Sequence, residues 1–317
     1  MKKRIISVML ATVFALSVIG CGTKDTKEQD AYRQYGITCM ESGKYEDAVK
    51  AFQNALGESI GHIGEKELDI CFYKAKAQAL DGKTKDALAT YNAIIKYNKD
   101  ARAYYLRGDL YMDMGEEKKG RADFESAVQQ GKKNYEIYIG IYESLSRHEK
   151  KDEGQKYLSA AMEIKGDKPE DELYKGRISY LLGENKDAIS YLEKAKEHKQ
   201  MLASYYLGLA YDANGDSDKA KKCIAEYRES GVATSYDLYE LGMQEMQDGN
   251  YKNALTYFNS GLELEKVPNK QNLMKSAIAA YEYSGDFDSA KKMMKEYLKA
   301  YPDDEEAKHE NTFLETR

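Results

Sequence analysis

The sequence contains no tryptophan, only three prolines and only four cysteines among its 317 residues. Scarce proline leaves long stretches free to form helices, because an interior proline removes a backbone hydrogen bond and kinks a helix. The cysteines include no closely spaced pair, which excludes a disulfide-dense framework and a paired-cysteine metal site. Cys39, Cys71 and Cys223 are expected to be small buried hydrophobic residues, and a bridge between Cys39 and Cys71 remains open.

Charges of both signs are interspersed along the repeats rather than segregated. The formal net charge is −6, and lysine pairs stand beside acidic residues. A nucleic-acid partner requires a basic face or stripe, so no nucleic acid is expected. No apolar run reaches the roughly 20 residues that a transmembrane helix needs.

Catalytic motifs are almost absent. The segment Gly57-Glu-Ser-Ile-Gly61 has the pattern of a nucleophile elbow and is followed by His62. That chemistry needs a strand before the serine, whereas residues 51–56 end a predicted helix. We therefore expect a connecting loop at Ser59, no catalytic residue and no enzymatic activity. The four histidines have no i, i+4 partner and no phosphate-binding glycine loop is present, so neither a metal nor a cofactor is expected.

What the sequence does contain is a turn residue, a small residue and a large apolar residue that recur eight times at fixed offsets. The small residues are separated by 39, 33, 34, 34, 32, 34 and 36 residues, and a period near 34 indicates stacked helical hairpins. The small residues are Ala48, Ala87, Gly120, Gly154, Ala188, Ala220, Ala254 and Ala290. The turn residues, five positions earlier, are Gly43, Gly82, Gly115, Glu149, Gly183, Gly215, Gly249 and Gly285. The large residues, four positions later, are Phe52, Tyr91, Phe124, Leu158, Leu192, Ile224, Phe258 and Met294.

The first helix of each hairpin has its own small position, twelve residues before that of the second helix. It is occupied by Gly36, Ala75, Gly108, Gly176, Gly208 and Gly242, and Tyr142 and Ile278 break the pattern. With this pattern, and with segments such as 104–111 (YYLRGDLY) and 204–211 (SYYLGLAY), the chain resembles the tetratricopeptide repeat family.

The resemblance covers roughly residues 29–303 and implies an all-α, right-handed solenoid of about eight hairpins. We expect one continuous array, because a solenoid grows by adding neighbours and needs no single core. Residues 304–317 are expected to form a capping helix, with Ala307, Phe313 and Leu314 covering the last hairpin. The family's frequent early tryptophan is absent, and its closing proline appears only as Pro302.

The N-terminus predicts export and lipid anchoring. Residues 2–4 are basic, residues 5–19 are apolar, and Val18-Ile19-Gly20-Cys21 resembles the lipobox of bacterial lipoproteins. We expect a signal peptide at residues 1–20, a lipidated Cys21, and a polar tether at residues 21–28. The protein would then be extracytoplasmic and lipid-anchored to the cell membrane, or to the outer membrane in a two-membrane cell.

A concave groove lined by first helices is the binding site that the resemblance implies. Projecting the repeat register onto it places tyrosine and methionine side chains inward, which suits adaptable recognition of a peptide. The predicted groove residues are Tyr105, Met112, Tyr180, Tyr205, Tyr236, Tyr239, Met243 and Met246. The Lys, Asn and Arg clamp that some members use for acidic C-termini is not matched, because cations are scattered at Arg33, Lys76, Arg102 and Arg177.

Three functions are compatible with this pattern. The first is a membrane-anchored scaffold that binds a protein or peptide partner in its groove. The second is a lipoprotein that captures a small molecule or glycan on the same aromatic lining. The third, an enzyme using the Ser59 loop, is the weakest because its strand is missing.

Overall fold

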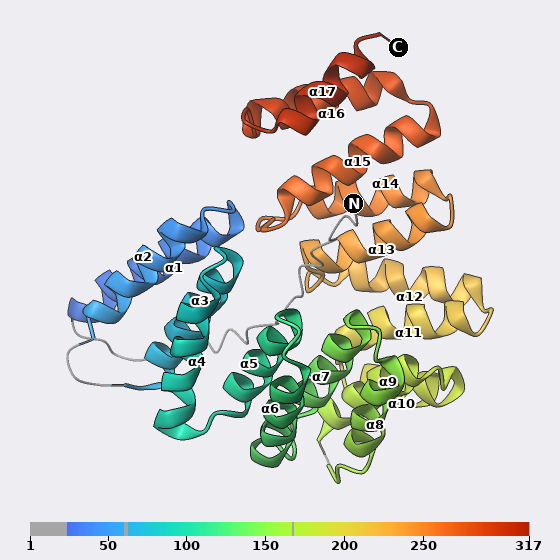
Figure 1. The fold of residues 1–317 in the computed structure, drawn as a ribbon. Helices are drawn as coiled ribbons and strands as arrows, with labels where there is room; N and C mark the ends of the chain where they lie inside the picture. Colours follow the sequence, from blue (N-terminus) through green and yellow to red (C-terminus); the bar gives the residue numbers. More distant parts are fainter. Residues whose placement is uncertain (1–23, 60–62, 167, 317) are drawn as a thin grey trace. The chain divides into compact units, whose positions relative to one another are not determined.

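The structure is a computed structural model, which describes residues 24–59, 63–166 and 168–316. Within these ranges there are seventeen helices and no strand. Consecutive helices pair as eight hairpins followed by a single helix (Figure 1). The first six hairpins are α1 (Lys24–Glu41) with α2 (Tyr45–Gly57), α3 (Glu65–Leu80) with α4 (Thr84–Asn98), α5 (Ala101–Asp113) with α6 (Glu117–Gln130), α7 (Tyr135–Arg147) with α8 (Lys151–Met162), α9 (Pro169–Leu182) with α10 (Asn185–Glu197), and α11 (Leu202–Ala213) with α12 (Ser217–Glu229). The last two are α13 (Ser235–Gln247) with α14 (Tyr251–Leu262) and α15 (Lys270–Ser284) with α16 (Phe287–Ala300), and α17 (Glu305–Leu314) follows.

The hairpin turns confirm the predicted register. All seven predicted turn glycines have positive φ, between 70° and 87°, and Glu149 occupies the eighth turn at φ 61°. After each of them, the next N–H donates to the carbonyl five residues back, as Lys44 does to Cys39 at 2.8 Å. This bond ends a helix whose last carbonyls would otherwise lack a partner.

The helix crossings have the predicted small-against-large packing. The eight large residues are at most 7% exposed, and a Cβ added to Gly108 would come within 2.8 Å of the Phe124 ring. In the fourth hairpin Tyr142 occupies the small position of the first helix. Gly154 compensates from the second helix, where an added Cβ would lie 3.1 Å from the Tyr142 Cα.

The two ends of the described chain compare differently with expectation. Helix α1 begins at Lys24, so residues 24–28 are helical rather than a tether, because extending an existing helix adds one hydrogen bond per residue. At the other end α17 caps the last hairpin as predicted, with Ala307 and Leu314 buried. Phe313 is only partly covered, with 44% of it exposed.

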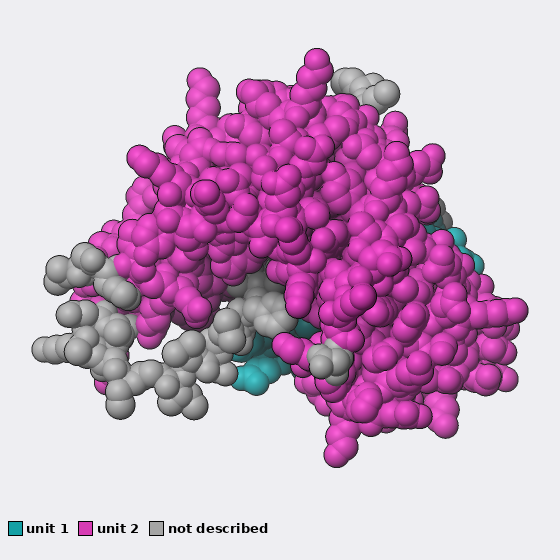
Figure 2. Space-filling model, turned by 90° about the horizontal axis from the view of Figure 1, so that it is seen from below, with its two compact units in different colours: residues 1–21, 233–317 teal, residues 22–232 magenta. Residues whose placement is uncertain are grey.

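The chain divides into two compact units between residues 232 and 233 (Figure 2). Unit 2, residues 24–232 as described, holds α1 to α12, and unit 1, residues 233–316 as described, holds α13 to α17. The sequence led us to expect one continuous array. The structure has two compact units instead, although the repeat register runs through both. Each unit has hydrophobic clusters of its own, such as that around Phe124 in unit 2 and that around Phe258 in unit 1.

The cysteines and the membrane-related segments can be compared with their predictions. Cys39, Cys71 and Cys223 are free thiols, with Cys39 and Cys223 buried and Cys71 half-buried. None of the helices described in residues 24–316 is long and apolar enough to cross a membrane. The predicted signal peptide and the lipidation site at Cys21 lie outside the described residues.

Candidate functional site

The eight predicted groove residues fall four in each unit. Those of unit 1 share one helix, α13, which faces α14 and α15. Tyr239 lies 6.1 Å from the Phe258 ring, and Ser276 Oγ donates to Met243 Sδ at 3.6 Å. Tyr236, Tyr239, Met243 and Met246 are all half-buried. They present part of each side chain to solvent while the rest fills the hairpin.

In unit 2 the four residues lie in different surroundings. Tyr180 lines a hollow of about 370 Å³ together with Tyr142, Lys151 and Gln155. Tyr205 is half-buried, and its ring centroid lies 5.0 Å from that of Tyr206 and 5.3 Å from that of Tyr227.

The other two unit 2 residues are drawn inward by packing. Tyr105 packs against the cluster around Phe124, with 6.4 Å between their ring centroids. Met112 is only 3% exposed and belongs to the same cluster. It therefore presents no surface to a partner, because Gly120 leaves a space in the facing helix that the methionine sulfur fills.

Charged side chains connect the first helices α5, α7 and α9, beside tyrosine contacts such as the stacked rings of Tyr135 and Tyr174, whose centroids lie 5.1 Å apart. We call this group the charge ladder, and it consists of Asp109, Asp113, Glu136, Glu143, Arg147 and Arg177. Arg147 forms an ion pair with Asp109 and lies 3.5 Å from Asp113. One repeat later Arg177 lies 3.0 Å from Glu143 and 3.5 Å from Glu136. The ladder continues to α11, where the Arg177 guanidinium lies 5.4 Å from the centre of the Tyr206 ring.

The electrostatics of the ladder are unbalanced, since four carboxylates face two guanidiniums. Burial raises the pKa of Asp109, and the charge of Arg147 only partly offsets this. Burial likewise raises the pKa of Glu143 against the opposing effect of Arg177. For Arg177, burial lowers the pKa, but Tyr206 and the two glutamates outweigh it and raise the pKa overall. The carboxylates of the ladder are therefore less well compensated than its guanidiniums.

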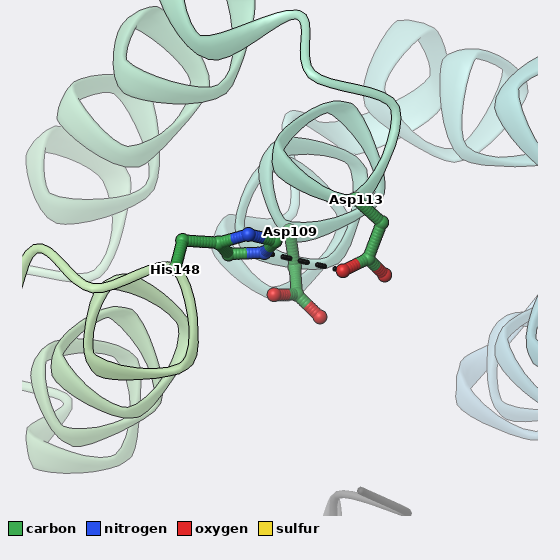
Figure 3. Close-up of side chains that lie close together, drawn as sticks. All are labelled: Asp109, Asp113 and His148. Carbon is green, nitrogen blue, oxygen red and sulfur yellow. Dashed lines mark ion pairs between the residues drawn. The ribbon is translucent and has the colours of Figure 1, made fainter. Parts of the chain in front are cut away.

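Three ligand-type side chains meet at one end of the ladder (Figure 3). Asp109 and Asp113 stand one turn apart on α5, which places them on the same face. His148 follows the last residue of α7, and its Nε2 lies 3.2 Å from Asp113 Oδ1. One oxygen or nitrogen atom from each of the three residues lies within 4.8 Å of the others. The left-handed turn at Glu149 ends α7 here and so fixes where the imidazole points.

Buried polar groups surround these three residues. The fully buried Ser144 hydroxyl, one turn before His148, lies within hydrogen-bonding reach of the Asp109 carboxyl and lowers the pKa of Asp109. Among the described residues, Arg147 Nε has no hydrogen-bond partner, although the same guanidinium pairs with Asp109. This end of the ladder is therefore a dense polar cluster.

The nucleophile-like motif has a structural role. Ser59 follows helix α2, with no strand before it, and its Oγ donates to Glu67 Oε1 at 2.9 Å and accepts from Gln29. Glu67 in turn accepts from the Gly64 N–H at 2.8 Å and so begins α3. His62 lies outside the described residues. Ser59 therefore anchors the α2–α3 connection to the first helix.

A second groove, of about 570 Å³, lies among α2, α3 and α4. Cys71, Ile94 and Tyr97 are among the residues that line it. It shares no lining residue with the charge ladder and contains none of the predicted groove residues.

Sequence reasoning missed the charge ladder, although one signal was present. Asp109, Glu143 and Arg177 follow one another at intervals of 34 residues, which places them at one position of three successive first helices. Three of the four cations that the sequence showed as scattered are paired, Arg33 with Asp69, Arg102 with Asp100 and Arg177 with Glu143. Spacing along the chain could not reveal His148, because its neighbours come from the preceding repeat.

Comparisons with known proteins agree with the fold. One tetratricopeptide repeat model matches residues 36–95 and 74–135, and a second matches residues 202–230 and 271–304. A comparison with curated proteins finds no match.

Similar solved structures include a tetratricopeptide repeat protein from Parabacteroides merdae ATCC 43184, at 12% identity over 80% of this chain and 99% of the other, with a TM-score of 0.47. Another is PilW, a type IV pilus biogenesis factor, at 17% identity over 66% of this chain and 97% of the other, with a TM-score of 0.42. A third is the APC/C hetero-tetramer Cut9–Hcn1, at 16% identity over 91% of this chain and 56% of the other, with a TM-score of 0.44. Because the matched repeat models together take in just over half of the residues, the chain belongs to the tetratricopeptide repeat family.

Proposed function

We propose that this protein is a membrane-anchored scaffold of the bacterial cell envelope that binds a protein or peptide through the first helices of its repeats. Tetratricopeptide repeat proteins generally mediate protein–protein interaction, and the fold is typically a non-catalytic scaffold. The proposed membrane anchor rests on the sequence of residues 1–21, with its basic start, apolar run and cysteine.

The observation that carries the proposal is the set of half-buried tyrosines and methionines on first helices. Tyr180 lines a hollow in unit 2, and α13 of unit 1 carries four such side chains on one helix. A tyrosine that is already packed on one side loses little conformational entropy when a partner covers its other side. Methionine adapts its shape to different neighbours.

The test separates the two units. Full-length lipidated protein is used to capture partners from membranes, beside one variant with Tyr180→Ala and Tyr205→Ala and another with Tyr239→Ala and Met243→Ala. Tyr97→Ala and Tyr283→Ala serve as controls, because these side chains are 54% and 68% exposed and are not among the proposed residues. Captured proteins are identified by mass spectrometry and their affinities measured with purified components.

We expect a partner whose affinity falls at least about tenfold in one double variant, which corresponds to about 1.4 kcal/mol. The controls should bind as the parent does, and thermal unfolding must show that each variant is folded. Equal binding by the parent and both double variants would overturn the assignment of the partner to the first helices.

The lipid anchor has its own test. A Cys21→Ser variant should lose metabolic labelling with palmitate and leave the membrane fraction, whereas Cys71→Ser should retain both. Membrane retention of an unlabelled Cys21→Ser protein would show that the apolar segment itself holds the chain in the membrane.

A further inference from the structure

The cluster of Asp109, Asp113 and His148 has the composition of a metal site. It offers two carboxylates and one imidazole, and zinc binds both kinds of ligand, commonly with three protein ligands and one water. In a tetrahedral zinc site with bonds of about 2.0–2.1 Å, neighbouring ligand atoms are about 3.3 Å apart. The separation of 3.2 Å between His148 Nε2 and Asp113 Oδ1 matches this spacing.

The charge of the ladder points to the same kind of ligand. Its four carboxylates and two guanidiniums leave an excess of two negative charges when all are ionised. One divalent cation would bring the ladder to neutrality. The fully buried Ser144 hydroxyl lies within hydrogen-bonding reach of Asp109 and adds a neutral oxygen beside the cluster.

We propose that Asp109, Asp113 and His148 bind one divalent transition-metal ion, with zinc the best fit to their donor atoms. The ion would join α5 to the end of α7 and so tie the third hairpin to the fourth. Its binding needs no partner protein and does not depend on the scaffold function proposed above.

Arg147 is the competitor for this site. Its guanidinium pairs with Asp109 and lies 3.5 Å from Asp113. A metal ion must therefore share these carboxylates with Arg147 or displace its guanidinium. Glu143 lies close enough for the charge of Arg147 to lower its pKa, and this carboxylate gives the displaced guanidinium a partner. Neutralising Arg147 should therefore strengthen metal binding, an effect that a purely structural ion pair would not produce.

The test is a titration of full-length protein, without a polyhistidine tag and stripped of metal, with Co²⁺ alone. We expect one equivalent to give the visible absorption of four- or five-coordinate cobalt, and Zn²⁺ to displace it. His148→Gln and Asp113→Asn should each weaken binding at least about tenfold, since even a residue behind a ligand changes affinity by that much. His198→Gln is the matched control and should bind as the parent does, while Arg147→Gln should bind more tightly.

Circular dichroism without metal shows whether each variant is folded, and the retained binding of the control and of Arg147→Gln keeps the test meaningful if one ligand variant fails to fold. Three results would overturn the proposal. They are a cobalt spectrum that stays that of the hydrated ion, equal affinities for the His148 and His198 variants, or a near-ultraviolet thiolate band placing the metal on cysteine.

Discussion

At the scale of the residue, the hairpin turns show what one backbone conformation requires. Seven turns place glycine in the left-handed region, where it is tolerated without steric penalty, and one places Glu149 there at φ 61°. An L-residue with a side chain is disfavoured in that conformation by roughly 1–2 kcal/mol. The fourth hairpin keeps the same helix-ending hydrogen bond, from the Lys150 N–H to the Leu145 carbonyl at 2.8 Å. Packing of α7 on α8 therefore holds a strained residue in place.

Replacing Glu149 with glycine should relieve this strain. Glycine loses more backbone entropy on folding, by roughly 0.5–1 kcal/mol, so we expect the Glu149→Gly variant to gain about 0.5–1 kcal/mol in free energy of unfolding. Urea denaturation measures it, and Gly115→Ala is the reverse control, expected to lose about 1 kcal/mol at an equivalent turn. A less stable Glu149→Gly variant would show that the glutamate side chain contributes more than its backbone costs.

At the scale of the element, the α2–α3 connection shows how one carboxylate joins a loop to two helices. Burial opposes ionisation of Glu67, but hydrogen bonds from Gln29, the Gly64 N–H and Ser59 outweigh it and lower the pKa of Glu67 to about 2. By accepting from the Gly64 N–H, the same carboxylate satisfies a backbone donor at the start of α3. The longest interval between small residues, 39 residues, is the one that includes this connection.

The low pKa of Glu67 predicts a pH dependence of stability. Because the folded pKa of about 2 is below the unfolded value of about 4.3, the ionised group stabilises the folded state above about pH 4.3. That contribution is lost as the pH falls toward 2. Allowing for solvent screening at this half-exposed position, we expect Glu67→Gln to lower the free energy of unfolding by about 1 kcal/mol at pH 7.

Denaturant unfolding at several pH values checks this expectation. The difference between the parent and Glu67→Gln should shrink steadily below pH 4. Glu65→Gln, on the exposed first turn of the same helix, is the control and should change little over that range. A difference between parent and Glu67→Gln that is independent of pH would mean that the charge of Glu67 is not what stabilises the connection.

At the scale of the whole molecule, the repeats fall into two compact units, each with its own buried clusters. Unit 2 contains six hairpins, whereas unit 1 contains two hairpins and the capping helix α17. In repeat proteins stability is roughly a sum over repeats and their interfaces, and about three repeats are needed for a stable fold. Unit 1 is therefore near the lower limit of size.

Fragments of residues 24–232 and 233–317 should both be helical, and they should differ in stability. We expect cooperative urea unfolding of the longer fragment with the steeper dependence on denaturant, since the slope follows the surface exposed. The shorter fragment should unfold at lower urea. Circular dichroism monitors both, and a shorter fragment without a cooperative transition would show that unit 1 does not fold alone.

The sequence by itself determined the hairpins, their turns and the positions that fill their interiors. These features are local: glycine permits the left-handed turn, and a small residue opposite a large one follows from the crossing of two neighbouring helices. The capping helix was predictable because it too is a local feature. The exposure of Phe313 was not predictable, because it depends on packing between helices.

Only the tertiary structure decided which side chains meet between hairpins. It buried Met112 inside a hairpin, divided the predicted groove residues between two units, and brought Arg147 to Asp109, 38 residues away. Contacts between hairpins depend on the small rotation and offset of each hairpin against the next. That geometry is set by the packing of many side chains at once, so a pattern that repeats in every hairpin does not reveal it.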